Sequence, residues 1–431
     1  MRRRDFLWRA GGGLWAVRSS VARAAPTPRG TAVRGPQKTA DGRKRLVVVM
    51  LRGAVDGLNV VVPHFEKDYY DARPGIAIGK PGTPDGALPL DTRFGLNPAL
   101  ASLMSLWREK QLAFVHAAGS PDPTRSHFDA QFTIESGTPG VHTTPDGWMN
   151  RLLAALPGPH GPTEAVAVGP TLPRILSGRI KVANLPLGPE ATRPLPLERP
   201  MIEAAFDRLY GGTDALAGAY REGKAAHAEL VGALVAEERI ADNSLGPPRG
   251  TAARGWGAPP PRSFPASARR LAALLRGDPH IRLAFAALGG WDTHVDQGGH
   301  KGRLAAHLSP LGAGLAAFAL GLGAEWRNTV VVVLSEFGRT LRENDARGTD
   351  HGHGNAIWVL GGAVGGGRVY GEWPGLAPGR LYQGRDLAVT TDFRQVLATI
   401  LERHLRLSDG ALAAIFPDPP AAAPGLAKLP A

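Results

Sequence analysis

Short runs of apolar residues recur along the chain, separated by longer stretches in which apolar residues have helical spacing. The runs are rich in Val, Ile, Leu and Phe, which is typical of strands buried on both faces. The stretches between them place apolar residues three or four positions apart, as in Leu100, Leu103 and Trp107, which indicates amphipathic helices. Strands alternating with helices predict an α/β fold with one mostly parallel, covered sheet. The strands are predicted at 45–51, 112–116, 164–168, 281–288, 329–334 and 356–360.

The helical pattern changes in the region 199–280. Its first helices alternate apolar with charged residues, and a Pro-rich stretch follows at 245–265. We therefore expect a peripheral helical insertion and linker within one domain that spans 45–416. The Pro/Ala-rich residues 417–431 predict a disordered tail. Helices are predicted at 98–107, 126–134, 199–210, 214–240, 266–276, 304–320 and 392–404.

The N-terminus has the features of an export signal. Residues 3–7 read Arg-Arg-Asp-Phe-Leu, a weakly apolar stretch follows, and residues 22–24 supply small side chains for cleavage. We predict a twin-arginine signal peptide at 1–24 and a disordered tether at 25–44. The twin-arginine translocase would then export the chain, making it periplasmic or secreted. The alternative interpretation is a disordered basic arm.

Net charge and residue usage exclude several classes of protein. The formal net charge is +12, but residues 1–25 contain six Arg and one Asp, so the mature chain carries about +7. The remaining basic residues form no long block, which argues against nucleic-acid binding. Cysteine is absent, which excludes a disulfide framework, a thiolate ligand and a Cys nucleophile. There is no run of eighteen apolar residues, so no stable membrane span is predicted.

Residues that suit a metal ion follow two of the predicted strands. The strand at 281–288 is followed by Gly-Gly-Trp-Asp-Thr-His, and the strand at 329–334 by Ser-Glu-Phe-Gly-Arg and then a Gly-Thr-Asp-His-Gly-His-Gly loop. Ligands of α/β sheets bind beyond the carboxyl ends of the strands. Carboxylate oxygen and imidazole nitrogen suit a divalent metal ion, whereas the alternative is a solvated loop. The candidate ligands are Asp292, His294, Glu336, Asp350, His351 and His353.

Two further strand ends carry less specific signals. The strand at 45–51 leads to Asp56 in an Asp-Gly pair, which is also common turn chemistry. The strand at 112–116 opens into a Pro-containing loop that ends with Arg125 and Ser126 before a helix. A hydroxyl at a helix start can serve as a nucleophile or in an anion site. Local spacing alone favours an ordinary N-cap at Ser126.

Together these motifs resemble a known family. The segments RGAVDGLN, PTRSHFDAQ, GGWDTH, SEFGRT and GTDHGHG, with the twin-arginine start, are similar to a bacterial secreted family of unknown function placed in the alkaline-phosphatase and sulfatase superfamily. The resemblance covers residues 46–404. It implies an alkaline-phosphatase-like α/β/α sandwich with a metal site at the carboxyl edge of the sheet, and it implies no particular substrate.

The resemblance also implies roles for individual residues. Asp56 corresponds to a first-strand metal ligand. The nucleophile corresponds to Ser126, or less closely to Thr124. Arg125 and His127 would then lie near the substrate anion. The remaining implied metal ligands are Asp292, His294, Glu336, Asp350, His351 and His353.

The sequence also departs from the superfamily pattern. The late strand ends in Glu-Phe-Gly where Asp-His-Gly is common, and an Asp-His-Gly occurs later at 350–352. No Cys-x-Pro-x-Arg or Ser-x-Pro-x-Arg lies near Arg125, so a formylglycine sulfatase is not expected. The favoured interpretation is an exported hydrolase of small anionic phosphate or sulfate esters, with zinc, manganese, calcium or magnesium neutralising the ester and Arg125 and Arg339 holding the developing anion. The alternative is a non-catalytic metal- or polyanion-binding protein with the same fold.

Overall fold

The computed structural model describes residues 42–169, 171–185, 200–225, 228, 258–420 and 423–429. The predicted signal peptide, most of the tether and most of the Pro-rich linker lie outside these residues.

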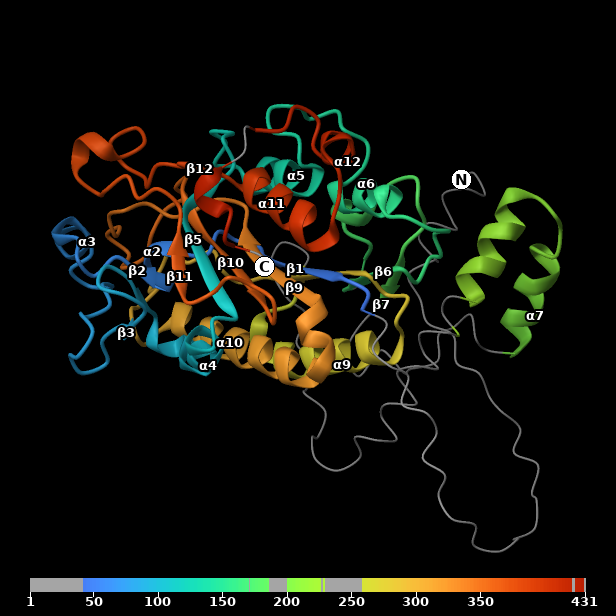
Figure 1. Ribbon diagram of the computed structural model, residues 1–431, viewed down its shortest axis with the longest axis horizontal. Helices are drawn as coiled ribbons and strands as arrows, with labels where there is room; N and C mark the ends of the chain where they lie inside the picture. Colours follow the sequence, from blue (N-terminus) through green and yellow to red (C-terminus); the bar gives the residue numbers. More distant parts are fainter. Residues whose placement is uncertain are drawn as a thin grey trace, which may run out of the picture.

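A nine-stranded sheet forms the centre of the molecule (Figure 1). All residues of β1 are buried, and β1 pairs in parallel with β8 on one side and β9 on the other. β10 is antiparallel to both β9 and β5, so it alone runs against the other strands of this sheet. The order is β11-β5-β10-β9-β1-β8-β6-β7, with β12 beside β5. The strands are β1 (Arg45–Leu51), β5 (Leu112–Gly119), β6 (Ala165–Val168), β7 (Ala183–Leu185), β8 (Leu283–Leu288), β9 (Thr329–Ser335), β10 (Asn355–Gly361), β11 (Arg368–Tyr370) and β12 (Thr391–Asp392).

Helices cover both faces of this sheet. Successive side chains of a strand point to opposite faces, and β1 therefore contributes to two cores. Val47 and Val49 pack with η1, α4, α9 and α10, whereas Leu46 and Val48 pack with α5, α6, α11 and α12. These helices are η1 (Pro98–Leu103), α4 (Met104–Arg108), α5 (His127–Ser136), α6 (Trp148–Ala155), α9 (Phe264–Gly277), α10 (Arg303–Leu322), α11 (Phe393–Leu405) and α12 (Asp409–Ile415).

Smaller elements lie around the sandwich. A second, antiparallel sheet has the strand order β2-β4-β3. Helix α7 has no buried residue and lies apart from the sandwich (Figure 1). The bounds are α2 (Gly57–Val60), β2 (Val61–Val62), α3 (Lys67–Ala72), β3 (Leu88–Pro89), β4 (Gly95–Leu96) and α7 (Pro200–Leu209).

The predicted α/β architecture with a mostly parallel, covered sheet is confirmed, and each of the six predicted strands is present. The short strands β7, β11 and β12 were not predicted, because runs of two or three residues carry no periodicity. The direction of β10 was not predicted either. No helix lies between β9 and β10, so the chain returns without the crossover that a parallel neighbour requires.

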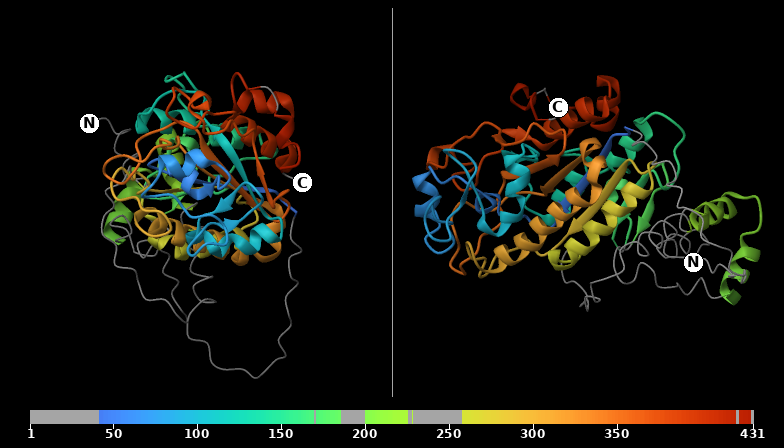
Figure 2. Two further views of the ribbon diagram at one scale, coloured as in Figure 1. Left: turned by 90° about the vertical axis from the view of Figure 1, so that its left-hand side faces the viewer. Right: turned by 60° about the horizontal axis from the view of Figure 1, so that its bottom comes forward.

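Two packing features differ from the sequence predictions. Helix α9 was expected in the peripheral insertion. It instead lies beside α10 on the same face of the sheet (Figure 2) and buries Phe264 and Leu271. The tail was expected to be disordered, but within 423–429 the side chains of Leu426 and Leu429 are buried against the second core. Apolar residues in both segments find a partner surface that local sequence does not show.

A long apolar helix and a cavity belong to the packed interior of the described residues. Among the described residues, Arg303–Asn328 is long and apolar enough to cross a membrane, but half of its apolar window is buried. Since α10 packs on the sheet and on α9, its apolar character serves the core. A cavity of about 230 Å³ between the sheet and these helices is lined by residues such as Val47, Leu271 and Phe318, with no titratable side chain.

Candidate metal centre

The carboxyl ends of β9, β1 and β8 lie side by side at one edge of the sheet. Glu336 follows β9 directly, while Asp56 and Asp292 follow β1 and β8 after short turns. The structure therefore places these three carboxylates at the same edge, as their sequence positions predicted. Helix α5 begins here too, because His127 contacts Glu336.

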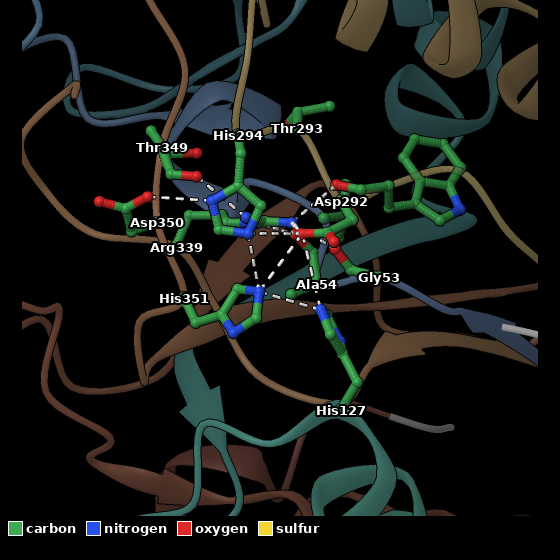
Figure 3. A network of polar contacts seen from close by, with 12 residues as sticks. Gly53, Ala54, His127, Asp292, Thr293, His294, Arg339, Thr349, Asp350 and His351 are labelled. Atoms are coloured by element: carbon green, nitrogen blue, oxygen red, sulfur yellow. Dashed lines mark hydrogen bonds and ion pairs between the residues drawn. The ribbon is translucent and has the colours of Figure 1, made fainter. Parts of the chain in front are cut away.

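Three histidines and one aspartate converge at this edge (Figure 3). The Nε2 atom of His351 lies 3.0 Å from Nε2 of His127 and 2.9 Å from Nε2 of His294. The Oδ1 atom of Asp292 lies 3.0 Å from His294 Nε2, 3.3 Å from His351 Nε2 and 3.6 Å from His127 Nε2. His127, Asp292 and His351 form a group that could hold a metal ion. His294 adjoins this group as a further nitrogen donor.

Each of the three imidazoles is fixed at its other nitrogen by an oxygen atom. Carboxylate and carbonyl oxygens accept hydrogen bonds, so each Nδ1 carries a proton. In a neutral ring each Nε2 therefore directs a lone pair towards the shared point. Histidines that bind metals are commonly oriented in this way by an outer acceptor. The bonds are His127 Nδ1 to Glu336 Oε1 (2.8 Å), His294 Nδ1 to Asp350 Oδ1 (2.9 Å) and His351 Nδ1 to the Arg125 carbonyl oxygen (2.9 Å).

This donor set fits a transition metal ion. Unprotonated nitrogens that face each other at 3.0 Å, as in His127 and His351, repel unless a proton or a cation lies between them. Imidazole nitrogen with one carboxylate suits zinc, iron or manganese, whereas calcium and magnesium prefer oxygen ligands. The side chain of His127 is 2% exposed and that of His294 is 38% exposed. The group is therefore closed at α5 and open to solvent at the His294 side.

The electrostatics of the group favour ionised carboxylates. Burial alone would raise the pKa of Asp292, but hydrogen bonds from His127, His351 and Arg339 hold it well below its usual value. Burial likewise opposes ionisation of Glu336, and the bond to His127 outweighs it, so the pKa of Glu336 is lowered. Burial lowers the pKa of His127, but Asp292 and Glu336 together raise it to about 8.

Arg339 holds the loops of the group together and is 1% exposed. Its guanidinium donates to the carbonyl oxygens of Ala54 at 2.7 Å and Gly53 at 2.6 Å, and to that of Thr349 at 2.9 Å. It also donates to Asp292 Oδ1 at 2.5 Å. The sequence-based role of Arg339 was to hold a substrate anion. The structure instead encloses it among protein acceptors, where it positions Asp292.

Two glycines explain the spacing of the GTDHGHG loop. A Cβ atom at Gly352 would lie 2.4 Å from the carbonyl carbon of Arg339, and one at Gly348 would lie 2.2 Å from the carbonyl oxygen of His294. Such contacts are not tolerated by a side chain, so glycine allows this loop to pack against both ligand-bearing segments. The close packing brings His351 to the other donors.

Asp56 lies at the same edge but is engaged elsewhere. It is completely buried, and Arg73 binds both of its oxygens, at 2.6 Å and 3.1 Å. Gln297 Nε2 donates to Oδ2 at 2.6 Å. This carboxylate, for which the resemblance implied a metal ligand, is thus placed in a buried ion pair rather than among the histidines.

The remaining predicted residues surround the group. The Ser126 hydroxyl accepts from Asp129 N at 3.4 Å as the N-cap of α5, and Thr124 Oγ1 accepts from Ser126 N at 3.2 Å. The His353 ring stacks on Tyr382 with ring centroids 4.1 Å apart, and burial lowers its pKa. Glu336 and Asp350 act here as partners of histidines rather than as direct donors to the shared point.

Sequence reasoning assigned His127 to the substrate anion and did not consider it as a metal donor. Its position at the start of a helix, directly after the capping Ser126, resembles an ordinary capped helix. The only local signal was the histidine itself within PTRSHFDAQ. Arg73 and Arg385, which contact Asp56 and the backbone of His351, were missed because neither follows a predicted strand.

Comparisons with known proteins give a family and distant structural similarities. The family described as "Protein of unknown function (DUF1501)" matches residues 43–416. No curated protein matches the chain. Ps i-CgsB in complex with k-i-k-neocarrahexaose aligns at 8% identity over 86% of this chain and 74% of that chain, with a TM-score of 0.39.

Two further solved structures have similar scores. The C-terminal periplasmic domain of EptC from Escherichia coli, in complex with Zn, aligns at 12% identity over 75% of this chain and 74% of that chain, with a TM-score of 0.35. A protein in the alkaline phosphatase superfamily from Vibrio parahaemolyticus aligns at 11% identity over 74% of this chain and 60% of that chain, with a TM-score of 0.34.

Proposed function

Because the chain belongs to the DUF1501 family, whose description assigns no activity, we propose from the site itself that it is an exported, metal-dependent hydrolase of phosphate or sulfate esters. The observation that carries the proposal is the convergence of His127, His294, His351 and Asp292, with each imidazole oriented by an oxygen acceptor. Neutral imidazoles gain little from one another, whereas a shared cation stabilises all four groups.

The donor atoms define how the metal would be held. Nε2 of His127, His294 and His351 and Oδ1 of Asp292 would bind it, and we propose zinc or manganese rather than calcium or magnesium. When bound, such an ion supplies a water of lowered pKa and neutralises the ester oxygens. Arg339 holds Asp292 in place, and Glu336 keeps the donating nitrogen of His127 directed at the ion. The open His294 side admits the substrate.

The role of Ser126 distinguishes two routes of hydrolysis. As a nucleophile its hydroxyl oxygen would attack the phosphorus or sulfur atom, breaking the bond to the ester oxygen; the alcohol leaves with the hydroxyl proton, and water then cleaves the covalent serine ester. Alternatively, a water molecule would attack the ester directly, without a covalent intermediate, and Ser126 would only cap α5. A Ser126→Ala variant abolishes the covalent route, but it reduces a direct route only through loss of the cap. Its turnover relative to the parent therefore separates the two routes.

A non-catalytic metal- or polyanion-binding protein is the second candidate. Two observations favour it: the Ser126 hydroxyl is used as a helix cap, and Asp56 is paired with Arg73 rather than offered to a second metal ion. We propose export through the twin-arginine translocase for either candidate, so the metal would be acquired before export.

The test combines metal analysis with a substrate screen. Protein purified without chelator is loaded with zinc or manganese, its metal content is measured by elemental analysis, and chromogenic phosphate monoesters, diesters and sulfate esters are assayed. We expect about one ion per chain and turnover of one ester class. His351→Ala and Asp292→Ala should each lose most of the metal and the turnover while remaining folded. A parent that binds no zinc or manganese contradicts the proposal, and a metal-loaded parent without turnover supports the second candidate.

A further inference from the structure

A second charged cluster lies next to the metal-binding histidines. Asp386 is completely buried, and two arginines bind its carboxylate. Arg125 Nη2 lies 2.6 Å from Oδ2, and Arg385 Nε lies 3.0 Å from Oδ1. Two guanidinium groups against one carboxylate leave an excess of one positive charge in this cluster.

Both arginines are joined directly to the candidate ligand His351. The carbonyl oxygen of Arg125 accepts the hydrogen bond from His351 Nδ1 at 2.9 Å, and Arg385 Nη2 donates to the carbonyl oxygen of His351 at 2.5 Å. His351 is therefore hydrogen-bonded to both arginines, to Arg125 through its imidazole and to Arg385 through its carbonyl oxygen.

The cluster retains unused hydrogen-bonding capacity. Arg125 Nε is buried and has no hydrogen-bond partner in the part of the chain that the structure describes. The side chain of Arg385 is 45% exposed. A buried N–H group without a partner is unfavourable, so this position favours an acceptor that comes from outside the protein.

We propose that Arg125 and Arg385 form an oxyanion-binding subsite beside the metal ion, which receives the non-bridging oxygens of a phosphate or sulfate group. The proposal rests on the proposed hydrolase function and specifies its substrate as a tetrahedral oxyanion ester. The planar guanidinium group matches such oxygens and binds them with charge-assisted hydrogen bonds. Asp386 holds both arginines in place through these ion pairs.

Anion titration of the zinc-loaded protein tests the subsite. Inorganic phosphate and inorganic sulfate are titrated calorimetrically at low ionic strength into the parent and into Arg385→Gln. We expect the variant to bind the preferred anion at least about tenfold more weakly, because a charge-assisted contact is lost. Arg385→Lys, which keeps the charge without the fork of donors, should lie between the two. Preference for phosphate or for sulfate identifies the ester class.

Arg347→Gln is the matched control. Arg347 is exposed and pairs with the exposed Asp296 at 2.6 Å, so its loss should leave anion affinity within about twofold. Zinc content and the thermal unfolding of each variant are measured in parallel, and both should match the parent. Equal anion affinity in the parent and Arg385→Gln, or no anion binding by the zinc-loaded parent, overturns the subsite.

A failure of the metal site would be visible separately. A parent that binds no zinc contradicts the proposed function, and the same anion titration of the metal-free protein then decides the subsite. A tenfold difference between the parent and Arg385→Gln supports it, and equal affinities overturn it.

Discussion

Replacing Glu336 by glutamine would remove a negative charge behind His127 while keeping the size and shape of the side chain. Glu336 is completely buried, and its Oε1 atom accepts from Gly53 N at 2.8 Å, Gln131 Nε2 at 3.0 Å and His127 Nδ1 at 2.8 Å. The amide oxygen of glutamine can accept the same bonds. The substitution should therefore keep the fold and change mainly the electrostatics of His127.

Two effects on zinc affinity act in opposite directions. Loss of the carboxylate partner of a metal-binding histidine weakens metal affinity about 10- to 100-fold, or about 1.4–2.7 kcal/mol. Competition between zinc and the proton on His127, in contrast, reduces the apparent zinc affinity of the parent. Burial lowers the pKa of His127, but Asp292 and Glu336 raise it to about 8, so at pH 7 zinc must displace a proton and its apparent affinity falls about tenfold. Glu336→Gln lowers this pKa and reduces that competition.

The assay is a competition titration of zinc against a chromogenic chelator between pH 6 and pH 9. His127 is protonated below its raised pKa, so the parent's affinity should increase about tenfold per pH unit up to about pH 8 and then become level. In Glu336→Gln the zinc affinity should reach its plateau at a lower pH, and the plateau affinity should be 10- to 100-fold lower than that of the parent. The difference between the proteins should therefore be largest above pH 8.

Glu135→Gln is the control for loss of a buried carboxylate. Glu135 lies on the same helix as His127, binds Arg52 at 2.6 Å and accepts from Ile175 N at 3.0 Å. This variant should lose folding stability but keep the zinc affinity and its pH dependence. The reasoning is refuted if Glu336→Gln has the same affinity above pH 8 and the same transition pH as the parent.

Three other predictions concern the fold, the loop and export. Asp56→Asn weakens the buried ion pair with Arg73, so the free energy of unfolding, measured in urea, should fall by about 3–5 kcal/mol. The metal content of the folded protein should stay unchanged, and loss of all metal would instead make Asp56 a ligand. Gly352→Ala would bring Cβ to 2.4 Å from a facing carbonyl carbon, so zinc affinity and thermal stability should both fall, and an unchanged variant would contradict the packing argument. Changing Arg3 and Arg4 to Lys should keep the precursor in the cytoplasm on cell fractionation, and export equal to that of the parent would rule out the twin-arginine route.

Several features of the fold could be predicted from local sequence because burial imposes them on each segment separately. The runs at 45–51 and 329–334 are apolar throughout, so they have to lie between two helical layers, and β1 and β9 are found there. Parallel strands bring their carboxyl ends to one edge. For this reason the positions of Asp292 and Glu336 after two strands were sufficient to predict that they lie on the same side of the sheet.

Which side chains meet at that edge depends on contacts between segments far apart in the chain. Glu336 orients His127, which is 209 residues away in sequence, and Asp56 pairs with Arg73 although its Asp-Gly context equally suits a metal ligand. Local spacing contains no information on such pairs, because loops from different strands must first pack against one another. Arg385 could not be predicted for the same reason, because it reaches the candidate metal ligand His351 only when the loop that carries it folds back onto this histidine.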